Sequence, residues 1–170
     1  MELLDLMKER YSVRAFADRP VEEEKIGYIL EAGRIAPTAH NNQPCRIRVI
    51  RSEAAREALK KCTACHYNAP LAFLVTYVDD ECWKREYDGH RSGDVDASIV
   101  TTHMMLAAAE QGIGTCWVMY FIPEAVKTEF ELPCGETPAA ILLAGYPADK
   151  AAPSPRHAER KSKAETVIEL

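Results

Sequence analysis

No long hydrophobic run occurs in the sequence. The longest strongly apolar stretch, residues 71–78 (LAFLVTYV), is far shorter than the roughly 18 residues that a membrane-spanning helix needs. The first residues, MELLDLMKER, lack the basic start and apolar centre of a signal peptide. We therefore expect a cytoplasmic protein with no membrane partner.

Positive charge is also in the minority. The chain has 21 Lys and Arg against 26 Asp and Glu, a net charge of −5. Its aromatic residues make up 8% of the chain and are not interleaved with the basic ones. This pattern is unlike that of a nucleic-acid-binding module, so we expect no nucleic-acid partner, although a local basic site remains compatible with the composition.

Cysteine offers no disulfide pattern. The six cysteines are scattered along the chain at Cys45, Cys62, Cys65, Cys82, Cys116 and Cys134. Without an export signal, reduced thiols are the expected state. Residues 62–66 (CTACH) match the attachment pattern of c-type haem, but a redox dithiol, a metal clip or incidental packing would use the same residues. No set of histidines at ligand spacing accompanies them, so we predict no metal site.

Two common functional motifs are incomplete or missing. Gly112 and Gly114 are followed by Trp117 at the position of the third glycine of a dinucleotide-binding fingerprint, so that fingerprint is incomplete. The Gly-x-Ser-x-Gly elbow of the α/β hydrolases does not occur. No serine or cysteine has sequence support as a nucleophile with a paired base. We therefore assign no catalytic side chain.

The 170 residues fit one domain, residues 1–170. Apolar residues three and four apart predict helices over residues 3–10, from Pro20 to just before Pro37, from Ser52, over 94–111 and from Pro123. Runs of β-branched and apolar residues predict strands over residues 46–51, 71–78, 115–119 and 139–146. This order of elements predicts an α+β or α/β sandwich of helices on a mixed sheet.

Residues 10–14 (RYSVR) are the first of three polar segments that could bind a ligand. If they are extended, Arg10, Ser12 and Arg14 share one face and form a row of donors about 13 Å long. Two guanidinium groups and a hydroxyl suit a long anionic ligand. On its own, such a segment is more often a solvated basic edge strand.

The other two segments are the loop at residues 36–45 (APTAHNNQPC) and the tail that follows Pro147. In the loop, two prolines restrict the backbone, while Thr38, Asn41 and Gln43 offer the donors and acceptors that recognition of a flat heterocycle requires. A plain connecting loop is the alternative. The tail contains Arg156, Arg160, Lys161 and Lys163, and a charge run of this kind is usually solvated.

Taken together, the segments resemble the small FMN-dependent nitroreductase family. That family has a helix, an Arg-x-Ser-x-Arg segment and, about two dozen residues later, a loop of the form Ala-Pro-Ser-x-x-Asn-x-Gln-Pro-Trp. The resemblance continues through Ala69-Pro70, the helix that runs into residues 112–117 (GIGTCW), residues 143–147 (LAGYP) and Arg160-Lys161. Thr38 replaces the usual Ser and keeps the hydroxyl, whereas Cys45 replaces the usual Trp and removes a large aromatic body.

The resemblance implies an α+β sandwich with a mixed, mainly antiparallel sheet flanked by helices. It also implies an intertwined homodimer with one FMN at each of two subunit interfaces. Residues 147–170 would then form a C-terminal arm that contributes to the flavin phosphate site and to the dimer. The implied cofactor-binding residues are Arg10, Tyr11, Ser12, Arg14, Pro37, Thr38, Ala39, Asn41, Gly114, Thr115, Cys116, Trp117, Arg160 and Lys161.

The resemblance also implies a role for each group of these residues. Arg10 and Arg160 would hold the phosphate with Lys161 nearby, and Ser12 and Arg14 would reach the ribityl chain and the pyrimidine side of the ring. The loop from Pro37 to Asn41 would approach the flavin from the partner subunit, and the backbone around Gly114 to Trp117 would line the ring. Residues 79–93 (DDECWKREYDGHRSG) are the candidate for a short substrate lid, with a surface loop as the alternative.

The expected activity is that of an oxidoreductase. The resemblance implies electron transfer from NAD(P)H through FMN to a nitroaromatic or quinone-type acceptor, with ping-pong kinetics. The alternative is a flavin-binding protein that stores, senses or fragments FMN without turning over such an acceptor.

Overall fold

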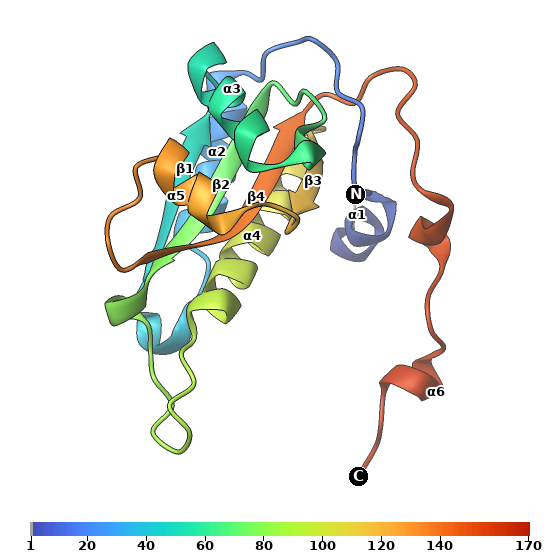
Figure 1. Cartoon of the computed structure of the whole chain (residues 1–170). Helices are drawn as coiled ribbons and strands as arrows, with labels where there is room; N and C mark the ends of the chain where they lie inside the picture. The colour runs from blue at the N-terminus through green and yellow to red at the C-terminus, as the bar shows by residue number, and fades with distance from the viewer. Residues whose placement is uncertain (1) are drawn as a thin grey trace.

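The computed structural model describes residues 2–170 and shows a four-stranded antiparallel sheet covered by helices (Figure 1). The strands are β1 (Cys45–Ile50), β2 (Leu71–Val78), β3 (Gly114–Val118) and β4 (Glu136–Gly145), in the order β1-β2-β4-β3. The helices are α1 (Leu3–Glu9), α2 (Glu23–Arg34), α3 (Glu53–Cys62), α4 (Gly93–Glu110), α5 (Pro123–Glu129) and α6 (Lys163–Thr166). Among the residues described, no helix has the length and apolar content needed to cross a membrane. The predicted α+β sandwich is confirmed.

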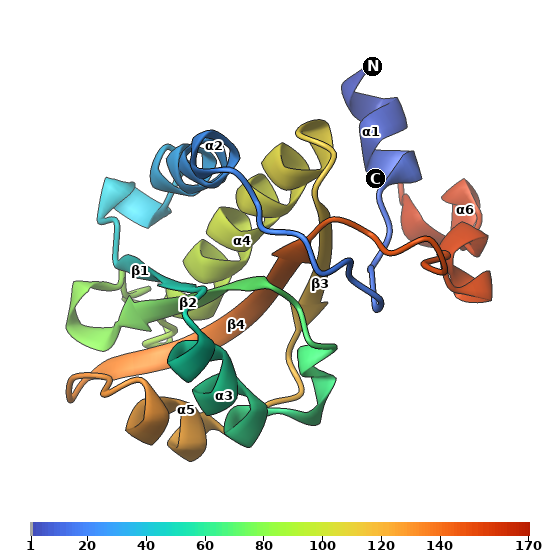
Figure 2. The ribbon, with the colours of Figure 1, turned by 90° about the horizontal axis from the view of Figure 1, so that it is seen from above.

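The two central strands, β2 and β4, contribute side chains to an apolar layer on each face of the sheet. On one face of the sheet, Phe73 and Leu142 pack with side chains of α2 and α4, including Ile29 and Met104. On the other face, Leu74 belongs to a second cluster that includes residues of α3 and α5, and Figure 2 shows these two helices on that side. Since both faces are covered, β2 and β4 are apolar on both sides, as their continuous runs predict.

The predicted elements are confirmed, with small shifts at their ends. Ser52 caps α3 by accepting a hydrogen bond from the backbone N of Ala55 at 3.2 Å. The expectation that Pro20 lies in the first turn of the second helix is wrong, because α2 begins at Glu23. Strand β4 begins at Glu136 rather than at residue 139, and the register shifts at the step opposite Pro138. A proline has no N–H for the ladder, so such an irregularity lets the strand continue past it.

Two segments lie beside this sandwich rather than within it. Helix α1 has no buried residue, and the chain from Pro147 onward runs alongside α1 before ending beyond α6 (Figures 1 and 2). Residues between α1 and α2 continue the sheet at its β3 edge through single bridges, Ser12 to Thr115 in parallel and Phe16 to Pro147 in antiparallel orientation. The N-terminal segment and the start of the C-terminal arm therefore meet at one edge of the sheet.

Candidate functional site

The segment that carries the Arg-x-Ser-x-Arg motif is extended along strand β3. The backbone N of Val13 donates to the carbonyl O of Thr115 at 2.8 Å, and Val13 is buried at 1% exposure. Gly114 permits this approach, because a Cβ built there would lie 2.6 Å from a methyl carbon of Val13. With Val13 facing inward, Arg10, Ser12 and Arg14 are left to line a pocket on the other side, as the period of two predicts.

That pocket has a volume of about 280 Å³ and collects four arginines. It is lined by Arg10, Tyr11, Ser12, Arg14, Ser154, Arg156, His157 and Arg160. Within residues 2–170, none of its four arginines forms an ion pair with a carboxylate. Most of the ion pairs elsewhere join side chains three residues apart in the sequence. The four arginines of this pocket instead lie together without a carboxylate partner, although the chain as a whole is acidic. We call this cluster the arginine pocket, and it is suited to a multivalent anion.

The C-terminal arm supplies half of the arginine pocket. His157 Nε2 lies 3.0 Å from the carbonyl O of Lys8, and the rings of Tyr11 and His157 meet edge to face with centroids 6.2 Å apart. These contacts hold the arm against α1. The structure brings Arg160 to the same pocket as Arg10, whereas Lys161 is exposed and outside the lining. Arg156 was noted only as part of the basic run of the tail and was given no role, and His157 was not singled out for a role; both line this pocket.

The predicted residues of β3 divide between the two faces of the sheet. Gly114 and Thr115 line a crevice of about 190 Å³ that also includes Arg10 and Tyr11. The thiol of Cys116 is buried with the α3 and α5 side chains, and this burial raises the pKa of the thiol, an effect that Arg14 and Ser12 partly oppose. The side chain of Trp117 packs on the opposite face. Among the residues described, its indole nitrogen is buried without a hydrogen-bond partner.

The polar loop lies at the other end of the molecule. Residues Ala39–Asn41 form one tight helical turn near the beginning of α4, whereas Arg10 of the arginine pocket lies against Met105, near the other end of that helix. Asp96, which bonds Ala39, and Met105, which contacts Arg10, are nine residues apart on α4, or about 14 Å along the helix at about 1.5 Å per residue. Figure 1 shows the loop and α1 on opposite sides of the sandwich. Within one chain, therefore, the structure does not bring Pro37, Thr38, Ala39 or Asn41 to the arginine pocket.

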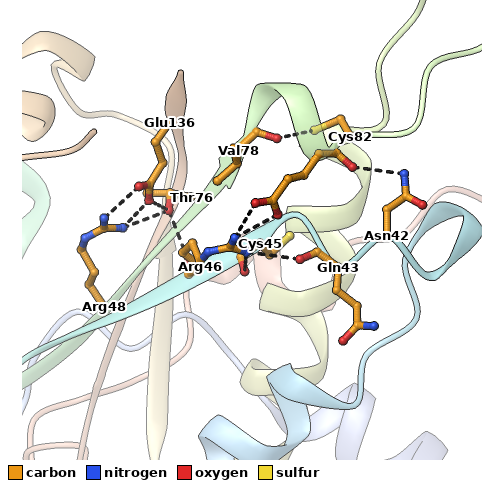
Figure 3. A network of polar contacts seen from close by, with 10 residues as sticks. Asn42, Gln43, Cys45, Arg46, Arg48, Thr76, Val78, Cys82 and Glu136 are labelled. Atoms are coloured by element: carbon orange, nitrogen blue, oxygen red, sulfur yellow. Dashed lines mark hydrogen bonds and ion pairs between the residues drawn. The ribbon is translucent and has the colours of Figure 1, made fainter. Parts of the chain in front are cut away.

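A network of charged side chains supports this loop (Figure 3). Nη2 of Arg46 donates to both carboxylate oxygens of Glu81, at 2.7 and 2.9 Å, and its Nη1 donates to the carbonyl O of Gln43 at 3.3 Å. The side chain of Asn42 donates to the carbonyl O of Glu81 at 3.1 Å. The loop is thereby tied to the segment that follows β2.

Deeper in the sheet, the same network contains a buried carboxylate. Arg48 donates to both oxygens of Glu136, and the hydroxyl of Thr76 donates to one of them. Glu136 is 6% exposed. The hydrogen bonds from Arg48 and Thr76 hold the pKa of the Glu136 carboxyl below its usual value, against the opposing effect of burial. Arg48 and Thr76 therefore compensate the charge of Glu136, and their hydrogen bonds stabilise the end of the sheet next to the loop.

Residues 79–93, the candidate lid, lie beside the loop. A short hairpin is closed by the bridge between Lys84 and Arg91, and Tyr87 near its tip is 98% exposed. The ring of Trp83 stacks on that of His40, with centroids 5.6 Å apart and an interplanar angle of 29°. The candidate lid and the loop therefore form one continuous surface.

The CTACH segment is built into the packing of the molecule. Cys62 ends α3 and is fully buried, and burial raises the pKa of its thiol to about 11. In the part of the chain that the structure describes, no three His, Cys, Asp or Glu side chains lie close enough together to hold a metal ion.

Comparison with known proteins places this geometry in context. The model of the nitroreductase family matches residues 7–72 and 63–146. A solved structure of a nitroreductase family protein from Clostridium difficile 630 is 43% identical, covers 99% of this chain and 98% of its own, and superposes with a TM-score of 0.93. A protein of Archaeoglobus fulgidus, provisionally named NADH dehydrogenase/NAD(P)H nitroreductase, is 32% identical over 88% of this chain and 87% of its own length.

One further solved structure contains a cofactor. It is a candidate nitroreductase of Desulfovibrio desulfuricans in complex with FMN, 27% identical, with a TM-score of 0.82 over 100% of this chain and 97% of its own.

Proposed function

The chain belongs to the nitroreductase family, and on that premise we propose that it is an FMN-dependent oxidoreductase that transfers electrons from NAD(P)H to an electron-poor acceptor. The names of its relatives support the activity, and the FMN complex of a relative supports the cofactor. The single observation in this chain that carries the proposal is the arginine pocket.

The residues of the arginine pocket fit the phosphate end of FMN. A phosphate monoester brings close to two negative charges at neutral pH and several acceptor oxygens, and unpaired guanidinium groups are its best protein partners. Arg10 and Arg160 would hold the phosphate, with Arg156 as an additional donor from the arm. Ser12 and Arg14, further along the extended segment, would hold the ribityl chain and the pyrimidine side of the ring.

When bound, FMN supplies the redox chemistry, accepting hydride from NAD(P)H and passing electrons to a nitroaromatic or quinone-type acceptor. The chain itself orients the cofactor and sets its electrostatic environment. A positive charge from Arg14 beside the pyrimidine side would stabilise negative charge on the reduced ring and raise its potential. The backbone from Gly114 to Trp117 would line the ring, and no side chain is required as an obligatory acid or base. Because donor and acceptor would use one face in turn, we expect ping-pong kinetics.

A second copy of the chain would complete the site. The loop from Pro37 to Asn41 contributes nothing to the lining of the arginine pocket of its own chain, so it would serve the pocket of a partner. An apolar hollow of about 570 Å³ along α4, lined in part by Val95 and Ile99, and the projecting α1 and arm favour an intertwined homodimer with residues 147–170 as its arm. Sedimentation equilibrium of the purified protein tests this dimer.

The proposed activity is tested by the visible absorbance spectrum of the purified protein, recorded before and after anaerobic addition of NADH or NADPH. Flavin bands that bleach with either nucleotide and return with an acceptor support the oxidoreductase. Flavin bands that persist with both nucleotides would instead favour a flavin-binding protein without this activity. Failure to bind FMN, even after incubation with an excess, would refute the assignment of the arginine pocket.

A further inference from the structure

A buried carboxylate outside the flavin-binding motifs holds the loop in place. Asp96, in the first turn of α4, is 1% exposed. One of its oxygens accepts a hydrogen bond from the backbone N of Ala39 at 2.9 Å, and the other accepts from the hydroxyl of Ser92 at 2.6 Å. Within residues 2–170, Asp96 has no ion-pair partner, so these two donors compensate its charge. Burying a carboxylate is costly unless it is hydrogen-bonded, and hydrogen bonds to a carboxylate are among the stronger ones, so these two bonds fix the group and its donors in place.

The loop that Asp96 holds has an unusual backbone. His40, Asn41 and Gln43 have φ angles of +53°, +55° and +53°, in the left-handed region that side chains with a Cβ rarely adopt. Such conformations persist only where the surroundings determine them. Bonds inside the loop contribute, since the backbone N of Gln43 donates to Thr38 Oγ1 at 3.0 Å. Asp96 adds the anchor from α4.

The same bonds decide which groups of the loop are left for a ligand. The N–H of Ala39 is used by Asp96, and the carbonyl O of Ala39 accepts from the backbone N of Asn42 at 3.1 Å. In the part of the chain that the structure describes, the side-chain amide of Asn41 has no hydrogen-bond partner, and the hydroxyl of Thr38 keeps its own proton to donate. Asn41 and Thr38, rather than the backbone of Ala39, are therefore the polar groups that the loop presents.

We propose that Asp96 is the positioning residue for flavin binding in the partner subunit: it holds the N–H of Ala39 and thereby sets the direction of Thr38 and Asn41. This inference rests on the proposed function, since it assumes that the loop completes the flavin site of a second copy. Asp96 itself touches no cofactor. It lies at the opposite end of α4 from the arginine pocket of its own chain, so any effect on FMN affinity must act through the loop.

The direct test compares Asp96→Ala and Asp96→Asn in the full-length apoprotein titrated with FMN. Asp96→Ala is expected to raise the Kd for FMN at least tenfold and to speed hydrogen exchange of the Ala39 amide at least tenfold. Asp96→Asn keeps an acceptor for that amide and is expected to stay within threefold of the unmodified protein in both measurements. Asp18→Asn makes the same chemical change at an exposed position outside the loop and α4 and is the matched control. An unchanged Kd for a folded, dimeric Asp96→Ala variant would overturn the proposal.

Should Asp96→Ala fail to fold, Ser92→Ala removes only the hydroxyl that orients the carboxylate and is expected to raise the Kd about threefold. An unchanged Kd for Ser92→Ala, together with an Ala39 amide that exchanges as fast as an unbonded amide in the unmodified protein, would also refute the role of Asp96.

Mixed dimers separate this inference from the proposed function. In a dimer of one Arg10→Ala chain with one Asp96→Ala chain, both lesions fall in the same site if the loop acts on the partner. The other site is then intact, so half of the sites are expected to bind FMN with unmodified affinity. If neither site recovers that affinity, Asp96 does not act on the partner subunit. If the unmodified protein binds no FMN at all, the proposed function has failed and the role of Asp96 fails with it.

Discussion

Replacing Arg10 by Ala removes the half-buried guanidinium of the arginine pocket, which lies between α1 and the end of α4. Its Nη1 is 3.9 Å from the sulfur of Met105, so the side chain is packed on one side. Arg14 and Arg160 are exposed, and water can substitute for their interactions more easily than for those of Arg10. A hydrogen bond between charged partners contributes about 1.5–3 kcal/mol. At about 1.4 kcal/mol per factor of ten, loss of one such interaction raises the Kd for FMN by about 10-fold to 150-fold.

Thermal unfolding provides a second measurement of the same loss. At an FMN concentration about 100 times the unmodified Kd, binding stabilises the folded protein by about 2.7 kcal/mol. A tenfold weaker variant retains about 1.4 kcal/mol of this effect, which lowers the Tm with FMN by about 3–5 °C for a chain of this size. The Tm without FMN is expected to change little, because Arg10 forms no ion pair within residues 2–170.

The control is Arg51→Ala, which removes an exposed guanidinium paired with Glu23 at a distant position and is expected to leave the Kd within twofold. Fluorescence titration of the apoprotein with FMN, at low and at physiological salt, measures both variants. If Arg10→Ala binds FMN as tightly as the unmodified protein, the arginine pocket is not the phosphate site.

Three other predictions follow from the structure. Glu136→Gln is expected to lower the free energy of unfolding at pH 7, measured in urea, by about 1–3 kcal/mol. Hydrogen bonds lower the pKa of Glu136 in the folded protein, so its contribution to stability is present above the unfolded pKa and is lost as the pH falls through the folded pKa. The difference in stability between the two proteins should therefore shrink in acid. Phe73→Ala, at 0% exposure, is expected to cost about 3–5 kcal/mol by the same measurement, and a loss under 1 kcal/mol would contradict the packing between the sheet and α4. Exposed Cys134 is expected to react with a thiol reagent at pH 8 in the native protein, whereas Cys45, whose pKa burial raises to about 12, is expected to react only after unfolding.

The fold was accessible from the sequence where one physical signal dominated. The run from Leu71 to Val78 matches β2 at both ends, because a strand covered on both faces has no polar position to blur its bounds. Positions that depend on contacts distant in the chain were less accessible. The start of β4 was placed three residues late, because Pro138 argues against a strand interior, and only the register shift opposite it shows how the strand accommodates the proline.

The candidate site was accessible only in part, for a related reason. The alternation of residues 10–14 identifies Arg10, Ser12 and Arg14 as one face, because it is a local property of an extended chain. The contribution of His157 depends on the arm folding back onto α1, which no local pattern encodes. Asp96 was invisible for a similar reason: an acidic residue in the first turn of a helix is expected near the positive end of the dipole, and nothing in the sequence shows that its carboxylate is buried under a loop 57 residues earlier.

Helix α4 connects the two halves of the proposed site. Near its beginning, Asp96 accepts a hydrogen bond from the backbone amide of Ala39, and near its end, Met105 lies against Arg10. In the proposed dimer these two contacts belong to different flavin sites, since the loop of each chain serves the pocket of the other. Eighteen residues of helix packed on the sheet through Val100 and Met104 form a rigid connection between them. A displacement of α4 that loosens the loop of one site therefore also moves the packing surface of Arg10 in the other, so variants in the core of α4 should affect both sites together.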